Sequence, residues 1–141
     1  MTVKRAPLIT VKTDDFEIKV DEGTANEEVY HPHAGETVTF KRRVTSRDLL
    51  TIARASDLQD QEGGAKALAH FFHDEACAVL GRAIFAWTWT DPYEEDEAGN
   101  PIPLPKPDTE ALRDLDAMTE LQYLLEKWLD VTSPPDEGNP Q

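Results

Sequence analysis

The sequence predicts an α+β fold, in which a small N-terminal antiparallel sheet precedes a helical region with one central core helix and short C-terminal helices. Between residues 16 and 45, apolar and charged residues alternate, which is the period of strands with one buried face. Residues 46–130 instead repeat their apolar positions at helical spacing and are expected to be mainly helical. A length of 141 residues suggests a single domain, which we place at residues 1–132. Residues 133–141 offer no apolar surface and are expected to form a disordered tail.

Two strands carry most of the evidence for the sheet. The segment FEIKV alternates so that Phe16 and Val20 share one face, and TVTFKRRV places Val38 and Phe40 on one face. The intervening DEGTANEE is typical of a turn. Ahead of these strands, the segment LITVK at residues 8–12 is a candidate for a further short strand.

The helices are predicted from apolar spacing and from capping residues. Ser46 is a typical N-cap residue, and Asp48 in the first turn suits the helix dipole. The strongest helical pattern spans residues 65–87, where a broad apolar arc predicts a core helix packed on more than one side. Further on, Asp108 and Asp116 are predicted to cap two short helices.

An acidic, proline-rich loop is expected at residues 91–107, between the central helix and the C-terminal helices. Its acids, in DPYEEDEAGN, do not follow the EF-hand order for calcium and are expected to be solvated. The prolines in PIPLPKP favour an extended, preorganised backbone.

Composition limits the classes of partner. The net charge is −14, from 28 acidic and 14 basic residues, which argues against nucleic acid and anionic membranes. No segment has the apolar run of a signal peptide or of a membrane span, so we expect a cytosolic protein. The single cysteine, Cys77, excludes an internal disulfide.

One group of side chains has the chemistry of a metal site. His70, His73, Asp74 and Cys77 share a helical face, and all four side-chain types can bind zinc. Structural zinc sites usually draw ligands from two separated segments, and no CxxC or HxxxH pair occurs elsewhere in the chain. We therefore expect no metal, no cofactor and no catalysis here. A small metal-dependent enzyme centred on His70, His73 and Cys77 stays open as an alternative.

A loose pattern runs through residues 84–130: a tryptophan at a helix end, a turn with an acidic residue and glycine, a Pro-x-Pro stretch, and Glu-Leu-x-aromatic-Leu in a short helix. This pattern resembles the C-terminal part of the small tail assembly chaperones of long-tailed bacteriophages. The residues that match it are Trp87, Trp89, Asp91, Gly99, Pro101, Pro103, Leu112, Leu115, Glu120, Leu121, Tyr123 and Leu124.

The resemblance implies a non-enzymatic role. Such chaperones hold the long tape measure protein and help tail tube subunits to polymerise on it, and a frameshift often produces a longer form. The resemblance thus implies the tape measure and tail tube proteins as partners, the cytoplasm of the bacterial host as location, and absence from the mature virion. Self-association as a homo-oligomer stays open. The main alternative is an acidic decoy or inhibitor that binds a basic or nucleic-acid-binding partner.

Four apolar residues are candidate partner contacts: Trp89, Leu121, Leu125 and Trp128. Trp87 closes the apolar arc of the central helix and is predicted to lie in the core, so that Trp87→Ala should destabilise the fold. Trp89 is instead predicted to be exposed as a binding anchor, so that Trp89→Ala should leave the protein folded. The alternative, in which these tryptophans are core packing under a proline strap, stays open.

Overall fold

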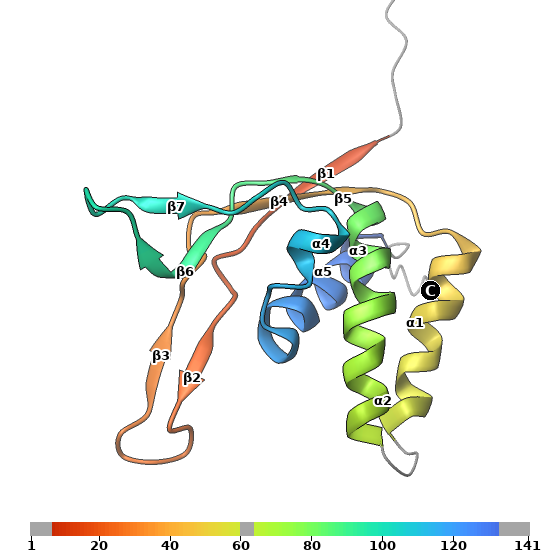
Figure 1. Ribbon diagram of the computed structural model, residues 1–141, viewed down its shortest axis with the longest axis horizontal. Coiled ribbons are helices and arrows are strands. Elements are labelled where there is room, and N and C mark those ends of the chain that lie inside the picture. The colour runs from red at the N-terminus through yellow and green to blue at the C-terminus, as the bar shows by residue number, and fades with distance from the viewer. Residues whose placement is uncertain (1–6, 60–63, 133–141) are drawn as a thin grey trace, which may run out of the picture.

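A three-stranded antiparallel sheet lies across one end of the helices (Figure 1). The computed structural model describes residues 7–59 and 64–132. The sheet has the order β1–β4–β5, and its strands are β1 (Leu8–Lys12), β4 (Thr37–Lys41) and β5 (Ile84–Trp87). The register pairs Phe40 with both Ile9 and Ile84, so that these side chains face the helices. The prediction of an α+β fold with a small antiparallel sheet is confirmed.

Two hairpins project from the same side of this body (Figure 1). The first arm pairs β2 (Ile18–Val20) with β3 (Glu28–Tyr30), and the second arm pairs β6 (Thr90–Glu95) with β7 (Pro101–Pro103). The apolar face predicted from FEIKV is buried at Phe16 but exposed at Val20, because the first arm leaves the body between these residues.

Strands also occur outside residues 16–45. β1 lies at the candidate strand LITVK, whereas β5, β6 and β7 follow the range and were not predicted. The region 91–107, expected to be an irregular loop, contains most of the second arm. Its tip is closed by Asp96 Oδ1, which accepts hydrogen bonds from the backbone N–H groups of Ala98 and Asn100, each at 2.9 Å. Gly99 supplies the positive φ of 84° that this turn requires.

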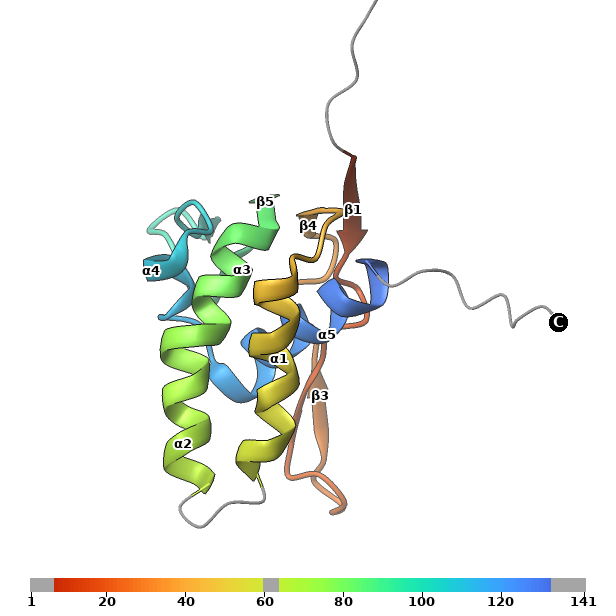
Figure 2. The ribbon, with the colours of Figure 1, turned by 90° about the vertical axis from the view of Figure 1, so that its right-hand side faces the viewer.

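The central helix consists of α2 (Gly64–His70), a π-helical turn η1 (Phe71–Ala76) and α3 (Cys77–Ala83). Figure 2 shows α1 (Ser46–Gln59) running alongside it. The predicted helix ends four residues early, because Ile84–Trp87 pairs with β4 as β5. β-Branched and aromatic side chains favour a strand where a free sheet edge is available.

The capping predictions are confirmed at two of three positions. Asp108 Oδ1 accepts from Ala111 N at 2.9 Å and begins α4 (Thr109–Leu112). Asp116 Oδ1 caps the π-helical turn η2 (Ala117–Leu121), which continues into α5 (Gln122–Thr132). Ser46 is not the cap of α1. The hydroxyl of Thr45 accepts from Asp48 N at 3.1 Å instead, and Ser46 is the first helical residue.

The core lies between the sheet and the helices. Gly81 permits a close approach here, because a Cβ at this position would lie 2.6 Å from Thr109 Oγ1 at the start of α4. Within the described ranges, no helix is both long and apolar enough to cross a membrane. The predicted tail at residues 133–141 lies outside the described residues. The buried core side chains are Val38, Phe40, Phe71, Phe72, Ala76, Cys77, Val79, Leu80, Ala83, Ile84, Trp89, Leu112, Leu121, Leu124, Leu125 and Trp128.

Candidate protein-binding surface

A buried histidine connects the N-terminal sheet region to the C-terminal helices. The His33 side chain is fully buried, with Nδ1 2.8 Å from Glu36 Oε1 and Nε2 2.7 Å from Glu120 Oε2. A doubly protonated ring donates to both carboxylates at once, whereas a neutral ring can donate to only one of them. Each carboxylate also accepts from the backbone, Glu36 from Thr90 N at 3.0 Å and Glu120 from Asp116 N at 2.9 Å. The network therefore fixes the ends of both arms that join the body, at His33 and Thr90, relative to η2.

Three aromatic rings stack in parallel from this histidine towards the surface. The rings of His33 and Trp89 are 3.9 Å apart with an interplanar angle of 4°, and those of Trp89 and Trp87 are 5.4 Å apart at 11°. The outermost ring, Trp87, is partly exposed, and its indole N–H donates to the carbonyl of Pro105 at 2.9 Å. Trp87, at the end of the stack, is thus held by its contact with Trp89 and by its hydrogen bond to Pro105.

The predicted exposure of Trp89 is therefore wrong, and the alternative of core packing holds for it, whereas Trp87 is only partly buried against the core. Trp89 is 1% exposed, whereas Trp87 is the more accessible of the two. Residues two apart in extended chain point to the same side, so an inward Trp87 places Trp89 inward as well. Trp89 then lies deeper, between Trp87 and His33.

The other predicted partner contacts are also core residues. Leu121, Leu125 and Trp128 are 2%, 8% and 0% exposed, because the apolar side of η2 and α5 packs against the core. In this structure they do not form a surface that a partner can reach. The large apolar residues that are exposed lie elsewhere: Leu8, Val20, Val29, Tyr30, Leu49, Leu50, Phe85, Tyr93 and Met118.

The predicted ligand group on the central helix is split between the interior and the surface. Cys77 is fully buried, and burial raises the pKa of its thiol to about 11. His70 and His73 are exposed, and His73 Nδ1 lies 2.7 Å from Asp74 Oδ1. Among residues 7–59 and 64–132, no three His, Cys, Asp or Glu side chains are grouped so as to hold a metal ion.

The two arms enclose a largely apolar hollow, which we call the arm groove. Its volume is about 520 Å³. Tyr93 on the second arm is 78% exposed and Tyr30 on the first arm is 48% exposed, so both rings are available for contact. The residues that line the arm groove are Ile18, Val20, Tyr30, His31, Pro32, Pro92 and Tyr93.

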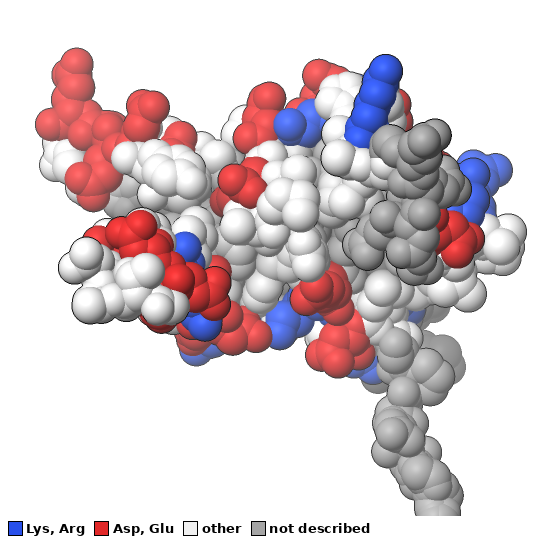
Figure 3. All heavy atoms as spheres, turned by 90° about the horizontal axis from the view of Figure 1, so that it is seen from below, with Lys and Arg blue, Asp and Glu red and all other residues white. Residues whose placement is uncertain are grey.

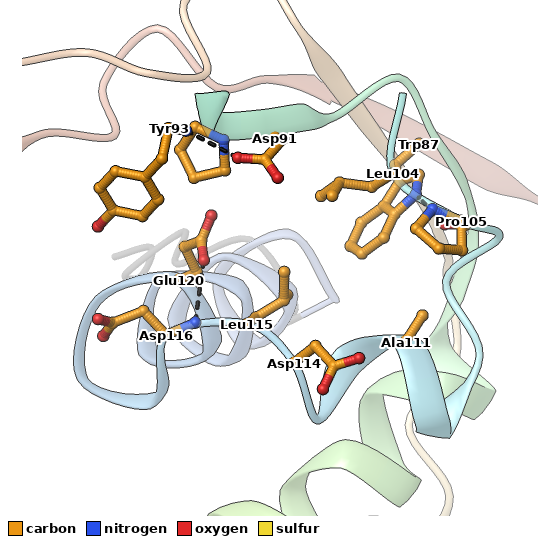
Figure 4. A pocket seen from close by; sticks show the side chains of 11 residues that line it. Trp87, Asp91, Tyr93, Leu104, Pro105, Ala111, Asp114, Leu115, Asp116 and Glu120 are labelled. Atoms are coloured by element: carbon orange, nitrogen blue, oxygen red, sulfur yellow. Dashed lines mark hydrogen bonds between the residues drawn. The ribbon is translucent and has the colours of Figure 1, made fainter. Parts of the chain in front are cut away.

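A second hollow, the Trp87 pocket, lies between the second arm and the segment from α4 to η2 (Figure 4). Its volume is about 430 Å³, and it shares Pro92 and Tyr93 with the arm groove. Trp87, Leu104 and Leu115 supply apolar walls. The remaining lining residues are Asp91, Pro105, Ala111, Asp114, Asp116 and Glu120.

Acidic side chains are numerous on the two arms, and four of them line the Trp87 pocket. In Figure 3, which views the molecule from below, red acidic atoms gather on the left, where the arms project. The negative charge has a local effect at Tyr30, where the neighbouring Glu28 raises the pKa of the phenol. Acidic residues in and between the paired strands of the arms are Asp21, Glu22, Glu27, Glu28, Asp91, Glu94, Glu95, Asp96 and Glu97.

Sequence reasoning missed the residues that make this surface. The sequence pattern places Tyr93 in an acidic loop and Tyr30 in the sheet, without an exposed role for either. The pairing of His33 with Glu120 spans 87 positions and leaves no local signal. Comparisons with protein-family models, curated proteins and solved structures find no match to the chain. The arm groove and the Trp87 pocket are therefore the candidate binding sites of the described residues.

Proposed function

We propose that this protein is a non-enzymatic tail assembly chaperone of a long-tailed bacteriophage. It binds the tape measure protein, the tail tube protein or both during tail assembly in the cytoplasm of the bacterial host, and it is absent from the mature virion. We refer to this partner as the client.

The observation that carries the proposal is the exposed apolar arm groove. Aromatic residues are enriched at protein interfaces, and exposed apolar surface that is hollowed and rimmed by polar groups is typical of binding sites. Tyr30 and Tyr93 stand on opposite arms and can contact a client segment between them. A chaperone that must keep an aggregation-prone protein soluble needs such apolar contacts on an otherwise strongly charged molecule.

The resemblance over residues 84–130 supports the same proposal. This part of the chain comprises β5, the second arm, α4, η2 and α5. It supplies Pro92 and Tyr93 to the arm groove and every lining residue of the Trp87 pocket. The segment that resembles the chaperone family is therefore also the segment that forms most of the candidate surface.

Co-expression with the tape measure protein of the same phage tests the proposal. We expect the wild-type chain to keep this client in the soluble fraction and to co-purify with it. Tyr93→Ser should reduce both effects, because it removes an exposed aromatic contact without opening the core. Leu50→Ser is the matched control, since Leu50 is 69% exposed on α1 and lies outside both hollows.

The proposal fails if the wild-type chain neither binds nor solubilises the tape measure or tail tube protein. It also fails if Leu50→Ser impairs the client as much as Tyr93→Ser does, since binding would then not depend on the arm groove.

A further inference from the structure

We propose that the Trp87 pocket receives a basic side chain, arginine or lysine, carried by the partner segment that contacts the arm groove. This inference names the chemistry by which a partner is recognised, and its link to a tail client rests on the proposed function. The pocket is open and combines an apolar wall with a rim of carboxylates (Figure 4).

The carboxylates of the pocket have no basic neighbour in its wall. Its lining includes Asp91, Asp114, Asp116 and Glu120, and no lysine, arginine or histidine. Glu120 is paired with His33, which leaves three aspartates without a cation among the lining residues. The pocket therefore carries a net negative charge that a basic side chain would complement.

Two basic residues adjoin lining residues in the sequence, Lys106 after Pro105 and Arg113 before Asp114, and neither is among the residues that line the pocket. The Nε of Arg113 donates to the carbonyl of His73 at 3.0 Å, and its guanidinium pairs with Glu110 at 2.5 Å. It is thus tied to the central helix and to α4 rather than to the pocket. Since no described basic residue lines the pocket, we infer that a partner would supply a cation there.

The aspartates also keep oxygens free for a ligand. Asp91 Oδ1 accepts the N–H groups of Tyr93 and Glu94, at 2.8 and 3.1 Å, which fixes the carboxylate and leaves Oδ2 available. In Figure 4 this carboxylate points into the hollow, opposite the turn between α4 and η2 that carries Asp114. The two groups lie on different elements, so a cation between them would join the second arm to the body.

The apolar wall explains why a long basic side chain fits better than a small ion. Arginine and lysine bury an aliphatic stem while their charged end stays near polar groups. Trp87 offers an aromatic wall whose ring is backed by Trp89 and whose N–H is held by Pro105. A guanidinium over an indole face gains cation–π attraction in addition to the ion pair. Leu104 and Leu115 can contact the stem.

The test uses three capped peptides of leucine and serine that differ only at one central residue, which is arginine, glutamine or glutamate. Binding to the ¹⁵N-labelled full chain is followed through the indole N–H resonance of Trp87. We expect the arginine peptide to shift this resonance and to bind roughly threefold to tenfold more tightly than the glutamine peptide, with the glutamate peptide weakest. The preference should decline as salt is added.

Two variants that each remove two negative charges test whether the preference for arginine depends on the pocket. Asp91→Asn/Asp114→Asn removes two pocket charges, and an asparagine side chain can still accept the turn hydrogen bonds through its amide oxygen. This variant should lose the preference for arginine. Asp57→Asn/Glu97→Gln removes two exposed charges outside the pocket and should retain it. Equal affinity for all three peptides, or equal loss in both variants, would overturn the inference.

The same variants separate this inference from the proposed function. If the wild-type chain and Asp91→Asn/Asp114→Asn bind the tail client equally well at low and high salt, the pocket inference is wrong and the chaperone proposal stands. If the peptides show the arginine preference but no tail protein is bound, the pocket inference stands and the chaperone proposal is wrong.

Discussion

The helical body and the two arms use large aromatic residues in opposite ways. In the body, Trp89, Trp128 and Phe40 are at most 1% exposed and pack against several elements. On the arms, Tyr30 and Tyr93 are 48% and 78% exposed. The same class of side chain therefore stabilises the fold in one region and is free to contact a partner in the other. Substitutions in the body should cost stability, and those on the arms should cost binding.

The arms are nevertheless anchored, because their roots belong to the body. An isolated two-stranded hairpin is only marginally stable in water. Phe16, at the root of the first arm, is 3% exposed, and its ring lies 5.3 Å from that of His33 and 6.0 Å from that of Trp89. Thr90, which begins the second arm, donates to Glu36 through both N–H and hydroxyl. The network around His33 thus positions both arms.

The largest expected effect is at the centre of this anchoring. Trp89→Ala should lower the free energy of unfolding by about 3–5 kcal/mol, because it removes a fully buried ring from between Trp87 and His33. Trp87→Ala should cost less, since Trp87 is partly exposed. Urea denaturation followed by circular dichroism measures both values.

Trp89→Phe provides the control for that measurement. Phenylalanine keeps an aromatic ring at this position and removes an indole N–H that has no partner within residues 7–59 and 64–132. The loss should therefore be smaller than for alanine. If Trp87→Ala proves more damaging than Trp89→Ala, the assignment of Trp89 to the body and of Trp87 to the pocket wall is wrong.

The second effect concerns the buried hydrogen bonds of His33. His33→Phe keeps a ring next to Trp89 but removes both hydrogen-bonding nitrogens, which leaves Glu120 Oε2 buried without its partner. We expect a loss of about 3 kcal/mol, because a buried polar group that loses its hydrogen-bond partner is no longer compensated for its desolvation. Adding Glu120→Leu to His33→Phe should recover part of this loss, since no charge is then left at that position. A double variant that is less stable than His33→Phe alone would contradict the explanation.

The sequence predicted those parts of the fold that depend on local signals. The caps at Asp108 and Asp116, the buried face of β4 at Val38 and Phe40, and the apolar arc of the central helix up to Ala83 are all local patterns. The strand β5 was missed because its residues continue the helical arc, and only pairing with β4 decides its conformation. The spacing of apolar residues within β5 does not show that the edge of β4, more than forty residues earlier in the chain, is available for pairing.

The candidate site was harder to predict than the fold. Apolar spacing identified Leu121, Leu125 and Trp128 as one side of a helix, but spacing does not say whether that side meets the core or a partner. Burial resolves the question in favour of the core. The acids of the second arm were visible in the sequence, whereas the hollow beside Trp87 depends on α4 and η2 folding back against this arm.

A smaller, pH-dependent change in stability is expected from the buried thiol of Cys77. Burial raises the pKa of the Cys77 thiol from 9.0 to about 11, so the folded state holds this proton more tightly than the unfolded state. The resulting contribution to stability is fully present below pH 9 and is lost as the pH rises from 9 to 11. The melting temperature of wild type should therefore fall more steeply over this interval than that of Cys77→Ala.

Alkylation of the same thiol provides an independent readout. At neutral pH the buried thiol is protonated, and iodoacetamide should modify it much more slowly in the native protein than in urea. Equal rates in the two conditions would show that Cys77 is accessible and that the body opens easily around η1 and α3.

The smallest effect on stability is expected on the arms. Tyr30→Ser/Tyr93→Ser should change the free energy of unfolding by no more than about 0.5 kcal/mol for each substitution, because both residues are exposed and lie outside the core. The same double variant should no longer keep the tail client soluble, since it removes one aromatic contact from each wall of the arm groove. Urea denaturation and co-expression are measured on one preparation. A large loss of stability would show that the arm tyrosines are structural, and the contrast between body and arms would then be lost. Unchanged stability together with unchanged client binding would instead locate the client contact outside the arms.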